Sequence, residues 1–202
     1  MKVFLASRNR KKIEEMERIL REHLPEVEVL GIDDVEGYDE PVEDQATFEG
    51  NALLKARAGF AATGLPALAD DSGLCVDALN GMPGVLSARW SGPPKSDDRN
   101  NELLLAQLED VPDERRSAHF MCAVAFVHAD GLGGEECASG VMPGKVVRGC
   151  RGSGGFGYDV LFEADDRPGL TTAELPREEK DAISHRGWAL RRMAPIVARI
   201  LQ

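Results

Sequence analysis

Residues 67–73 read Ala-Leu-Ala-Asp-Asp-Ser-Gly, so a short apolar run leads directly into two adjacent carboxylates. The run follows a glycine and a proline that are typical of a helix end, and we expect residues 67–69 to begin a short buried strand. Asp70 to Gly73 would then lie at the carboxyl end of that strand. Ligands of open α/β sheets gather at such ends.

The two aspartates at the end of this predicted strand allow two interpretations. Burying an unpaired carboxylate is costly, so a metal ion, a cation or catalytic use would compensate for it. Asp-Asp-Ser-Gly is also good turn chemistry, and a turn would leave both carboxylates in water. If both lie on a strand, consecutive side chains point to opposite faces, and only one of Asp70 and Asp71 faces a given site.

Hydrophobic periodicity and capping residues predict the elements on either side of this stretch. Strands are expected at residues 2–6, 27–32 and 158–162 and, with weak alternation, between 117 and 147. Three helices are expected to begin after the caps Asn9, Thr47 and Ser96, the last two ending near 62 and 108, and a fourth runs from about 178 and is bent or interrupted at Pro195. The alternation of strands and helices predicts an α/β or mixed α+β fold in one domain, residues 1–202.

Composition limits the partners. The chain has 202 residues, 43% of them hydrophobic, and a formal net charge of −11, which argues against a nucleic-acid polymer but allows a small anionic ligand. The start of the chain lacks the pattern of a signal peptide, and no apolar run approaches the roughly 20 residues that cross a bilayer. Four scattered cysteines predict reduced, mostly buried thiols in a cytoplasm.

A cluster of basic residues lies between the first predicted strand and helix. Its members are Ser7, Arg8, Asn9, Arg10, Lys11 and Lys12. Free backbone N–H groups and the dipole at a helix start favour an anion, and the basic side chains could bind phosphate oxygens. The glycines of a P-loop are missing, so an ordinary capped helix explains the same pattern.

An acidic loop at residues 33–44 offers Glu43 as a hard oxygen ligand, and Lys55 follows on the next predicted helix. Magnesium takes one or two carboxylates together with waters and substrate phosphates. Position alone does not choose Glu43 over Glu40 or Asp44.

Two later segments could bind a flat ring. In the glycine-rich stretch at 152–159, small residues would let a ligand approach the backbone and leave Phe156 to stack on a nucleobase, although a flexible hairpin with a core phenylalanine fits as well. His185 and Arg186, with Lys180 just before them, could contact the polar edge of a base or a phosphate. A structural histidine at a helix start is the alternative.

Taken in order, these segments resemble the inosine triphosphate pyrophosphatase family, also called Ham1-like, over nearly the whole chain. The matching residues are Ser7, Asn9 and Lys12; Thr47-Phe48, Asn51-Ala52 and Lys55-Ala56; Ala69 to Leu74; Pro83-Gly84 with Ser87 to Arg89; Gly154 to Asp159; and Ser184 to Gly187. Each motif alone is weak, but their ordered combination is specific. Arg8 and Lys11 stand where many relatives carry glycine, and Gly50 stands where a glutamate is common.

The resemblance implies Mg²⁺-dependent hydrolysis of noncanonical purine nucleoside triphosphates (ITP, dITP and XTP) to a monophosphate and pyrophosphate, which cleanses the nucleotide pool. It implies that Asp71 is the general base and a metal ligand and that Glu43 is a second metal ligand. Substrate would be held by Ser7, Arg8, Asn9, Arg10, Lys11, Lys12, Lys55 and Ser72 at the triphosphate, and by Phe156, Gly157, Tyr158, Asp159, Lys180, His185 and Arg186 at the base. The implied fold is an elongated mixed sheet flanked by helices, in two lobes with a cleft between them, and the implied assembly is a homodimer.

These roles agree with general chemistry, because a carboxylate can deprotonate a water whose pKa a metal ion has lowered. A donor facing position 6 of the purine would reject an amino group there, and the residues leave open whether His185, Arg186 or a backbone N–H supplies it. Three rival readings are a Maf-like nucleotide pyrophosphatase of related fold, a catalytically silent nucleotide-binding protein and a general metal-dependent phosphatase that releases orthophosphate.

Overall fold

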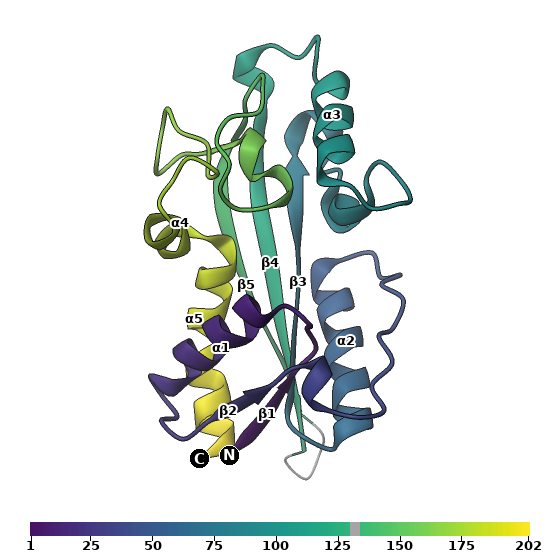
Figure 1. Cartoon of the computed structure of the whole chain (residues 1–202), viewed down its shortest axis with the longest axis vertical. Coiled ribbons are helices and arrows are strands. Elements are labelled where there is room, and N and C mark those ends of the chain that lie inside the picture. The colour runs from purple at the N-terminus through teal and green to yellow at the C-terminus, as the bar shows by residue number, and fades with distance from the viewer. Residues whose placement is uncertain (130–133) are drawn as a thin grey trace. The chain divides into compact units, whose positions relative to one another are not determined.

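The computed structural model describes residues 1–129 and 134–202 (Figure 1). Its strands are β1 (Lys2–Leu5), β2 (Glu28–Leu30), β3 (Ala67–Val76), β4 (Ser117–His128), β5 (Gly134–Val146) and β6 (Phe162–Ala164). Its α-helices are α1 (Arg10–Arg21), α2 (Phe48–Thr63), α3 (Asp97–Gln107), α4 (Arg177–Ile183) and α5 (His185–Leu201). Short 3₁₀ helices are η1 (Ile32–Asp34), η2 (Asp77–Leu79), η3 (Gly84–Arg89), η4 (Asp113–Arg115) and η5 (Gly157–Leu161).

The strands form one sheet in the order β2-β1-β3-β4-β5-β6. The strand β1 pairs in parallel with β2 and with β3, whereas β5 pairs antiparallel with β6. A sheet with both kinds of pairing and helices between the strands confirms the predicted mixed α/β class.

The described chain divides into two compact units. The first contains Met1–Asp71, Cys122–Ser139 and Trp188–Gln202, and the second contains Ser72–Met121 and Gly140–Gly187. The single domain over residues 1–202 stays a prediction.

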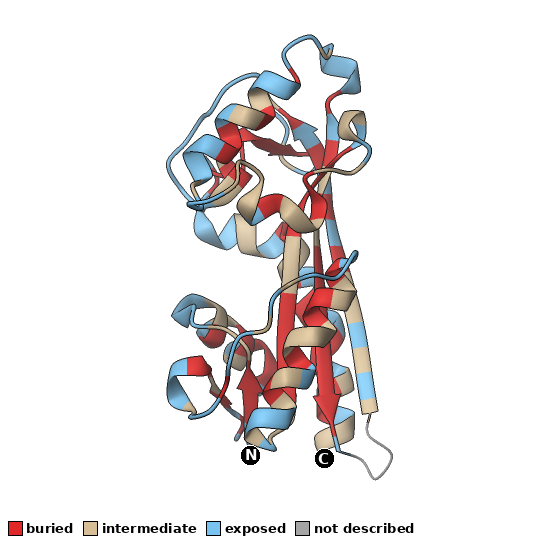
Figure 2. Ribbon diagram, turned by 90° about the vertical axis from the view of Figure 1, so that its right-hand side faces the viewer, coloured by how far each residue is buried: buried red, intermediate tan, exposed pale blue. Residues whose placement is uncertain are grey.

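In the first unit the inner strand β1 is covered on both faces. Val3 and Leu5 pack with apolar side chains of α1 and α5, while Phe4 points to the other face and packs against Tyr38 and Ala67. Figure 2 shows buried residues concentrated on the strands and exposed residues on the outer sides of the helices. A parallel strand covered on both faces explains why residues 3–6 are continuously apolar.

The second unit has its own hydrophobic core. Leu74 of β3, Phe120 of β4 and Leu104 of α3 meet in it, together with Tyr158 and Leu161 of η5. Because η5 carries the end of the glycine-rich segment, this core fixes one side of that segment.

All three predicted helix caps are confirmed. The Asn9 side chain accepts a hydrogen bond from the Lys11 N–H, and the Thr47 and Ser96 hydroxyls accept from the N–H groups three residues later. Each cap satisfies a backbone donor that the first helical turn leaves without a partner.

The prediction that the strand beginning at Ala67 ends at the aspartates is wrong, and so is the turn interpretation. β3 continues to Val76, and Asp70 and Asp71 lie in its middle. The strand continues because both carboxylates find cationic partners and because the residues after Gly73 are apolar and enter the second core. β3 extends beyond its neighbour β1, which pairs with it at Ala67 and Leu68.

The strand predicted at residues 158–162 is also wrong. Residues 157–161 form η5, and only Phe162–Ala164 is a strand. Tyr158 and Leu161 are both buried at a spacing of three, which is the repeat of a 3₁₀ helix. Strand character is confirmed for most of 117–147, while residues 130–133 within that prediction lie outside the described residues.

The last helix is interrupted at Ser184, and not at Pro195 as predicted. Ser184 has extended backbone angles, and its hydroxyl accepts a hydrogen bond from the Gly187 N–H at 3.0 Å, so it caps the start of α5. The helix α5 then runs through Pro195 to Leu201. Proline has no backbone N–H, so α5 lacks one hydrogen bond there and continues without it.

The expectation that the cysteines are mostly buried is wrong for half of them. All four thiols are free, Cys75 and Cys122 are buried, and Cys137 and Cys150 are exposed. Among the residues that the structure describes, no helix has the length and apolar character needed to cross a membrane.

The antiparallel pair of β5 and β6 predicts the effect of one added methyl group. A Cβ at Gly144 would lie 2.2 Å from the Glu163 carbonyl oxygen and 2.6 Å from the Phe162 ring, and a paired backbone cannot yield. We expect Gly144→Ala to lower the free energy of unfolding by roughly 1–3 kcal/mol in urea titrations. Gly149→Ala is the matched control, because a Cβ there meets no atom within 4 Å. Equal stability of the two variants would contradict the tight β5–β6 packing.

The two tyrosines of the chain predict its alkaline behaviour. Burial, helped by the charges of Glu40 and Glu43, raises the pKa of Tyr38 to about 12, and burial with the charge of Asp97 raises the pKa of Tyr158. An unfolded tyrosine has a pKa of about 10. The neutral phenols therefore add stability that is complete below about pH 10 and is lost as the pH rises through their folded pKa values. Tyrosinate absorbance should be nearly absent from the folded protein at pH 10 and half developed in urea, and a folded protein that titrates like the urea sample would contradict this.

Candidate active site

Asp71 on β3 is the centre of a group of charged residues in the first unit. Its Oδ2 accepts a hydrogen bond from the Asn51 amide at 3.0 Å, and its Oδ1 lies 3.8 Å from Lys55 Nζ. Asn51 and Lys55 lie one turn apart on α2, so one face of that helix supplies both contacts. Lys55 Nζ also donates to Glu43 Oε1 at 2.5 Å. Lys55 thus links the two carboxylates.

The neighbouring Asp70 points to different partners. Its Oδ2 accepts a hydrogen bond from Lys12 Nζ of α1 at 2.7 Å, and the residue is 4% exposed. Asp70 therefore contacts α1, whereas Asp71 contacts α2. This difference confirms that only one carboxylate of the pair faces a given group of residues. A partner at this distance makes the burial of the Asp70 charge tolerable.

Protonation in this group is shifted by its surroundings. Burial raises the pKa of Asp71 above its ordinary value, Lys55 and the Asn51 hydrogen bond partly offset that rise, and the charges of Glu43 and Asp70 add to it. Burial works to lower the pKa of Lys55, but the hydrogen bond to Glu43 and the charge of Asp71 outweigh it, so the Lys55 pKa is raised. Lys55 is therefore a fixed cation between two acidic groups.

The basic segment before α1 is divided between several tasks. Ser7 Oγ accepts from the Asn9 N–H at 3.1 Å, and Asn9 caps the helix, so both side chains shape the turn. Arg8 binds Asp33 at 2.6 Å and Glu40 at 3.4 Å, and Arg10 binds Asp34 at 3.4 Å.

Lys11 in the same segment is exposed, whereas Lys12 reaches Asp70. Of the predicted phosphate contacts in this segment, Lys12 is the one that the fold joins to the aspartate pair of β3.

The three candidate carboxylates of the acidic loop have different partners. Glu40 pairs with Arg8, and Asp44 accepts from the neighbouring Gln45 side chain, while Glu43 alone of these three contacts Lys55. Sequence position could not make this choice, because the loop has no periodic structure that fixes where each carboxylate points.

The predicted base-binding residues line one cavity of about 140 Å³ in the second unit. Six of them contribute, namely Phe156, Gly157, Tyr158, Asp159, Lys180 and His185. Ser72, predicted at the triphosphate, also lines the cavity, together with Gly73, Ser87, Ala88, Asp97 and Phe120. A cavity of roughly 150 Å³ encloses one benzene ring. This one therefore has room for one ring of a purine, with the rest of the bicycle at its mouth.

Phe156 and Lys180 form the polar and aromatic edge of this cavity. The Phe156 ring is 75% exposed, which leaves its face accessible, and Lys180 Nζ lies 5.4 Å from its centroid. The buried Asp159 carboxylate binds Lys180 and accepts from the Phe156 N–H at 2.8 Å and from the Thr172 hydroxyl at 2.8 Å.

The opposite part of the cavity is built on His185 and Phe120. Their rings are nearly parallel, 11° apart with centroids 4.9 Å from each other. Tyr158 donates its hydroxyl to the Ser87 carbonyl at 2.9 Å and is therefore occupied in the core. Arg186 lies in the first turn of α5 and does not line the cavity.

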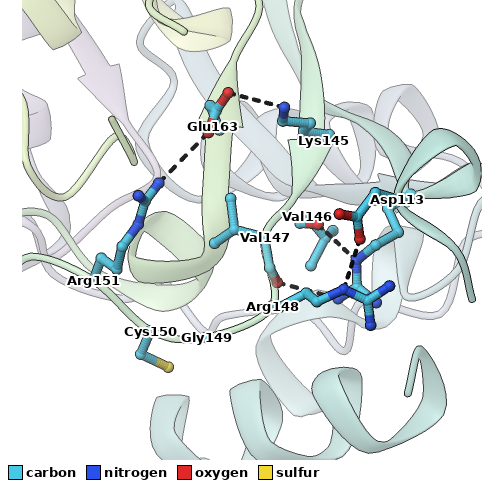
Figure 3. A pocket seen from close by; sticks show the side chains of 10 residues that line it. Asp113, Lys145, Val146, Val147, Arg148, Gly149, Cys150, Arg151 and Glu163 are labelled. Atoms are coloured by element: carbon cyan, nitrogen blue, oxygen red, sulfur yellow. Dashed lines mark hydrogen bonds and ion pairs between the residues drawn. The ribbon is translucent and has the colours of Figure 1, made fainter. Parts of the chain in front are cut away.

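A larger cavity of about 390 Å³ in the second unit shares no lining residue with this one. Figure 3 shows its charged side chains bonded to one another: Glu163 lies 3.1 Å from Lys145 and 3.5 Å from Arg151, and Arg148 lies 2.6 Å from Asp113. Arg116 donates to three backbone carbonyls at its rim. With these groups engaged in structural bonds, we do not place the site there.

The residues of these two groups that the resemblance did not name as substrate or metal contacts include Asn51, Asp70 and Asp97. Asn51 orients Asp71, Asp70 binds Lys12, and Asp97 lines the base cavity. The spacing of four between Asn51 and Lys55 on a predicted helix was a usable signal for Asn51. Nothing in the sequence linked Asp97 to the distant Phe156 segment.

Comparisons with known proteins find relatives over nearly the whole chain. A protein of Nocardia farcinica named dITP/XTP pyrophosphatase is 57% identical over 198 residues, covering 98% of this chain and 95% of the relative. One of the same name from Corynebacterium glutamicum is 53% identical over 204 residues, covering 99% of this chain and 98% of the relative.

Solved structures match as well. A dITP/XTP pyrophosphatase of Mycobacterium abscessus superposes with a TM-score of 0.80 at 52% identity, over 96% of this chain and 100% of the other. A HAM1 protein of Coxiella burnetii superposes with a TM-score of 0.90 at 38% identity, over 98% of this chain and 99% of the other. The sequence model of the Ham1 family matches residues 3–196. With the aspartate pair, the lysines and the phenylalanine-bearing glycine segment all inside that match, the chain belongs to the Ham1 family.

Proposed function

We propose that this protein hydrolyses noncanonical purine nucleoside triphosphates to a monophosphate and pyrophosphate. The observation that carries the proposal is the setting of Asp71, which the Asn51 amide orients and Lys55 holds beside Glu43. The names of close relatives, dITP/XTP pyrophosphatase, support the substrate class.

Asp71 would act as the general base. Its raised pKa makes it a better proton acceptor than an ordinary aspartate. It would accept a proton from the water that attacks the α-phosphorus while pyrophosphate leaves with the electrons of the broken anhydride bond. The Asn51 hydrogen bond fixes one carboxylate oxygen and so sets the direction of the other.

The donor set near Asp71 suits a divalent cation, and we propose Mg²⁺. The described residues hold no group of three acidic, histidine or cysteine side chains that would enclose a metal by themselves. Magnesium needs only one or two carboxylates when phosphates and waters complete its shell, and Asp71 with Glu43 meets that need. The ion would neutralise phosphate charge and lower the pKa of a bound water.

The triphosphate would be held by Lys12, Lys55 and the backbone at the start of α1. Lys12 and Lys55 are partly buried cations whose present partners are carboxylates, and phosphate oxygens offer equivalent acceptors. The predicted contacts of Ser7, Asn9 and Ser72 belong to the same proposal. Arg8 and Arg10 would add positive charge near the triphosphate without binding it as directly, because both already pair with the acidic loop.

The base would stack on Phe156 in the cavity of the second unit, with Gly157, Tyr158 and Asp159 forming its wall. His185 or a backbone N–H of the cavity wall would donate to the oxygen at position 6, since Arg186 does not line the cavity. A donor that meets an amino group is left without a partner, which disfavours adenine nucleotides.

The homodimer implied by the resemblance and the cytoplasmic location belong to this proposal as well. The four free thiols support a reducing compartment. Sedimentation at several protein concentrations would test the dimer.

A substrate panel tests the reaction. With Mg²⁺ present, dITP, ITP and XTP should yield equimolar pyrophosphate and monophosphate, while ATP should be turned over at least about tenfold more slowly, because its 6-amino group leaves the buried donor at position 6 without a hydrogen bond. Products are identified by anion-exchange chromatography. Orthophosphate as the first product would point to a general phosphatase, preference for pyrimidine nucleotides to a Maf-like enzyme, and unchanged rates after EDTA treatment would contradict the metal.

Replacement of the proposed base gives a second test. Asp71→Asn keeps the shape and the Asn51 contact but cannot accept a proton, so kcat should fall by about 10²-fold or more with unchanged thermal unfolding. The control is Asp110→Asn, the same substitution at an exposed position outside both residue groups. Wild-type turnover by Asp71→Asn would show that another group is the base.

A further inference from the structure

Gly157 is held at both of its backbone polar groups by one helix. Its N–H donates to Asp97 Oδ2 at 2.8 Å, and its carbonyl accepts from the Asn101 amide at 3.0 Å. Asp97 and Asn101 are four residues apart at the start of α3, so they lie on one face of that helix. Two side chains of one helix turn thus grip a single residue some sixty positions away in the sequence.

The gripped residue directly follows the proposed stacking ring. Phe156 is flanked by Gly155 and Gly157, both in the left-handed region, with φ of +73° and +61°. Neither neighbour has a side chain that could pack, and the Phe156 ring itself is 75% exposed. Hydrogen bonds to the backbone are therefore the main interactions that fix the position of this segment.

The helix that supplies the grip is itself firmly anchored. Leu104 and Leu108, at the end of α3, are fully buried in the second core, and the Asn100 amide is bonded to the Ser87 carbonyl at 3.3 Å. Asn101 is 4% exposed, and the hydrogen bond that its side chain makes within the described residues is the one to the Gly157 carbonyl. If this contact is lost, the buried amide has no hydrogen bond left to offset its desolvation, and the protein loses stability.

From this geometry we infer that Asp97 and Asn101 are positioning residues for the purine, which act by fixing Gly157 and, through it, the Phe156 ring. The inference rests on the proposed function, because it assigns the fixed ring to the base of the nucleotide. Stacking on the base acts equally in the ground state and the transition state. Loss of the grip should therefore weaken nucleotide binding without slowing the chemical step.

The kinetic test uses Asp97→Ala, which removes the acceptor for the Gly157 N–H. KM for dITP should rise about tenfold with kcat within about twofold of wild type, because a hydrogen bond to a charged group is lost from the pre-formed site. Asp97→Asn keeps an acceptor oxygen and should restore most of the change. Asp98→Ala is the matched control, since it removes a carboxylate from the same first turn of α3 without touching the loop. Asn101→Ala, checked for folding by thermal unfolding, should also raise KM.

A binding measurement separates this inference from the proposed function. Calorimetry with inosine monophosphate reports on the base cavity without any turnover, and Asp97→Ala should weaken binding by the same factor as it raises KM. If the wild type binds inosine monophosphate but hydrolyses no dITP, the proposed function falls and the calorimetric comparison still decides the grip. Equal affinity and equal KM in Asp97→Ala and Asp98→Ala overturn the inference, as does a wild type that binds no inosine monophosphate.

Discussion

Two adjacent carboxylates in the middle of a buried strand must each be compensated by a cation or a donor, and most of the first unit is arranged to do this. Consecutive side chains of β3 leave on opposite faces, so Asp70 meets Lys12 of α1, and Asp71 meets the Asn51 and Lys55 pair of α2. The strand can then continue past the aspartates as regular structure. Asp-Asp-Ser-Gly is also good turn chemistry, so these partners help the strand to prevail over a turn.

Compensation of this kind also makes the carboxylates useful. A fully neutralised aspartate is a weak base, but Asp71 keeps a raised pKa because burial and the nearby Glu43 and Asp70 charges outweigh Lys55. Lys55 in turn stays charged because two acidic groups share it. A phosphate or a divalent cation entering this group would replace one partner by another whose charge has the same sign, which costs less than desolvating a charge without any partner.

The second unit solves a different problem, which is how to present an exposed aromatic ring on a glycine-rich segment. Apolar packing fixes Tyr158 and Leu161 on the core side. Asp159 accepts from the Phe156 N–H, and Asp97 and Asn101 bind the backbone of the next residue, Gly157. Glycines let the chain turn sharply there, at the cost of a looser backbone. Side-chain bonds to the main chain restore the lost order.

The sequence by itself determined the elements whose causes are local. Apolar periodicity and the caps Asn9, Thr47 and Ser96 located three helices closely, and the ordered motifs located the family. Tertiary structure decided where strands end and which charges meet. β3 runs through the aspartates, residues 157–161 form a 3₁₀ helix, and the last helix is interrupted at Ser184 and continues through Pro195. The contact of Glu43 with Lys55 and that of Asp97 with Gly157 were decided there too. The physical reason is that a cap or a periodic face is read within a few residues, whereas the partner of a buried charge or a loop carbonyl comes from a distant segment that only the folded chain brings near.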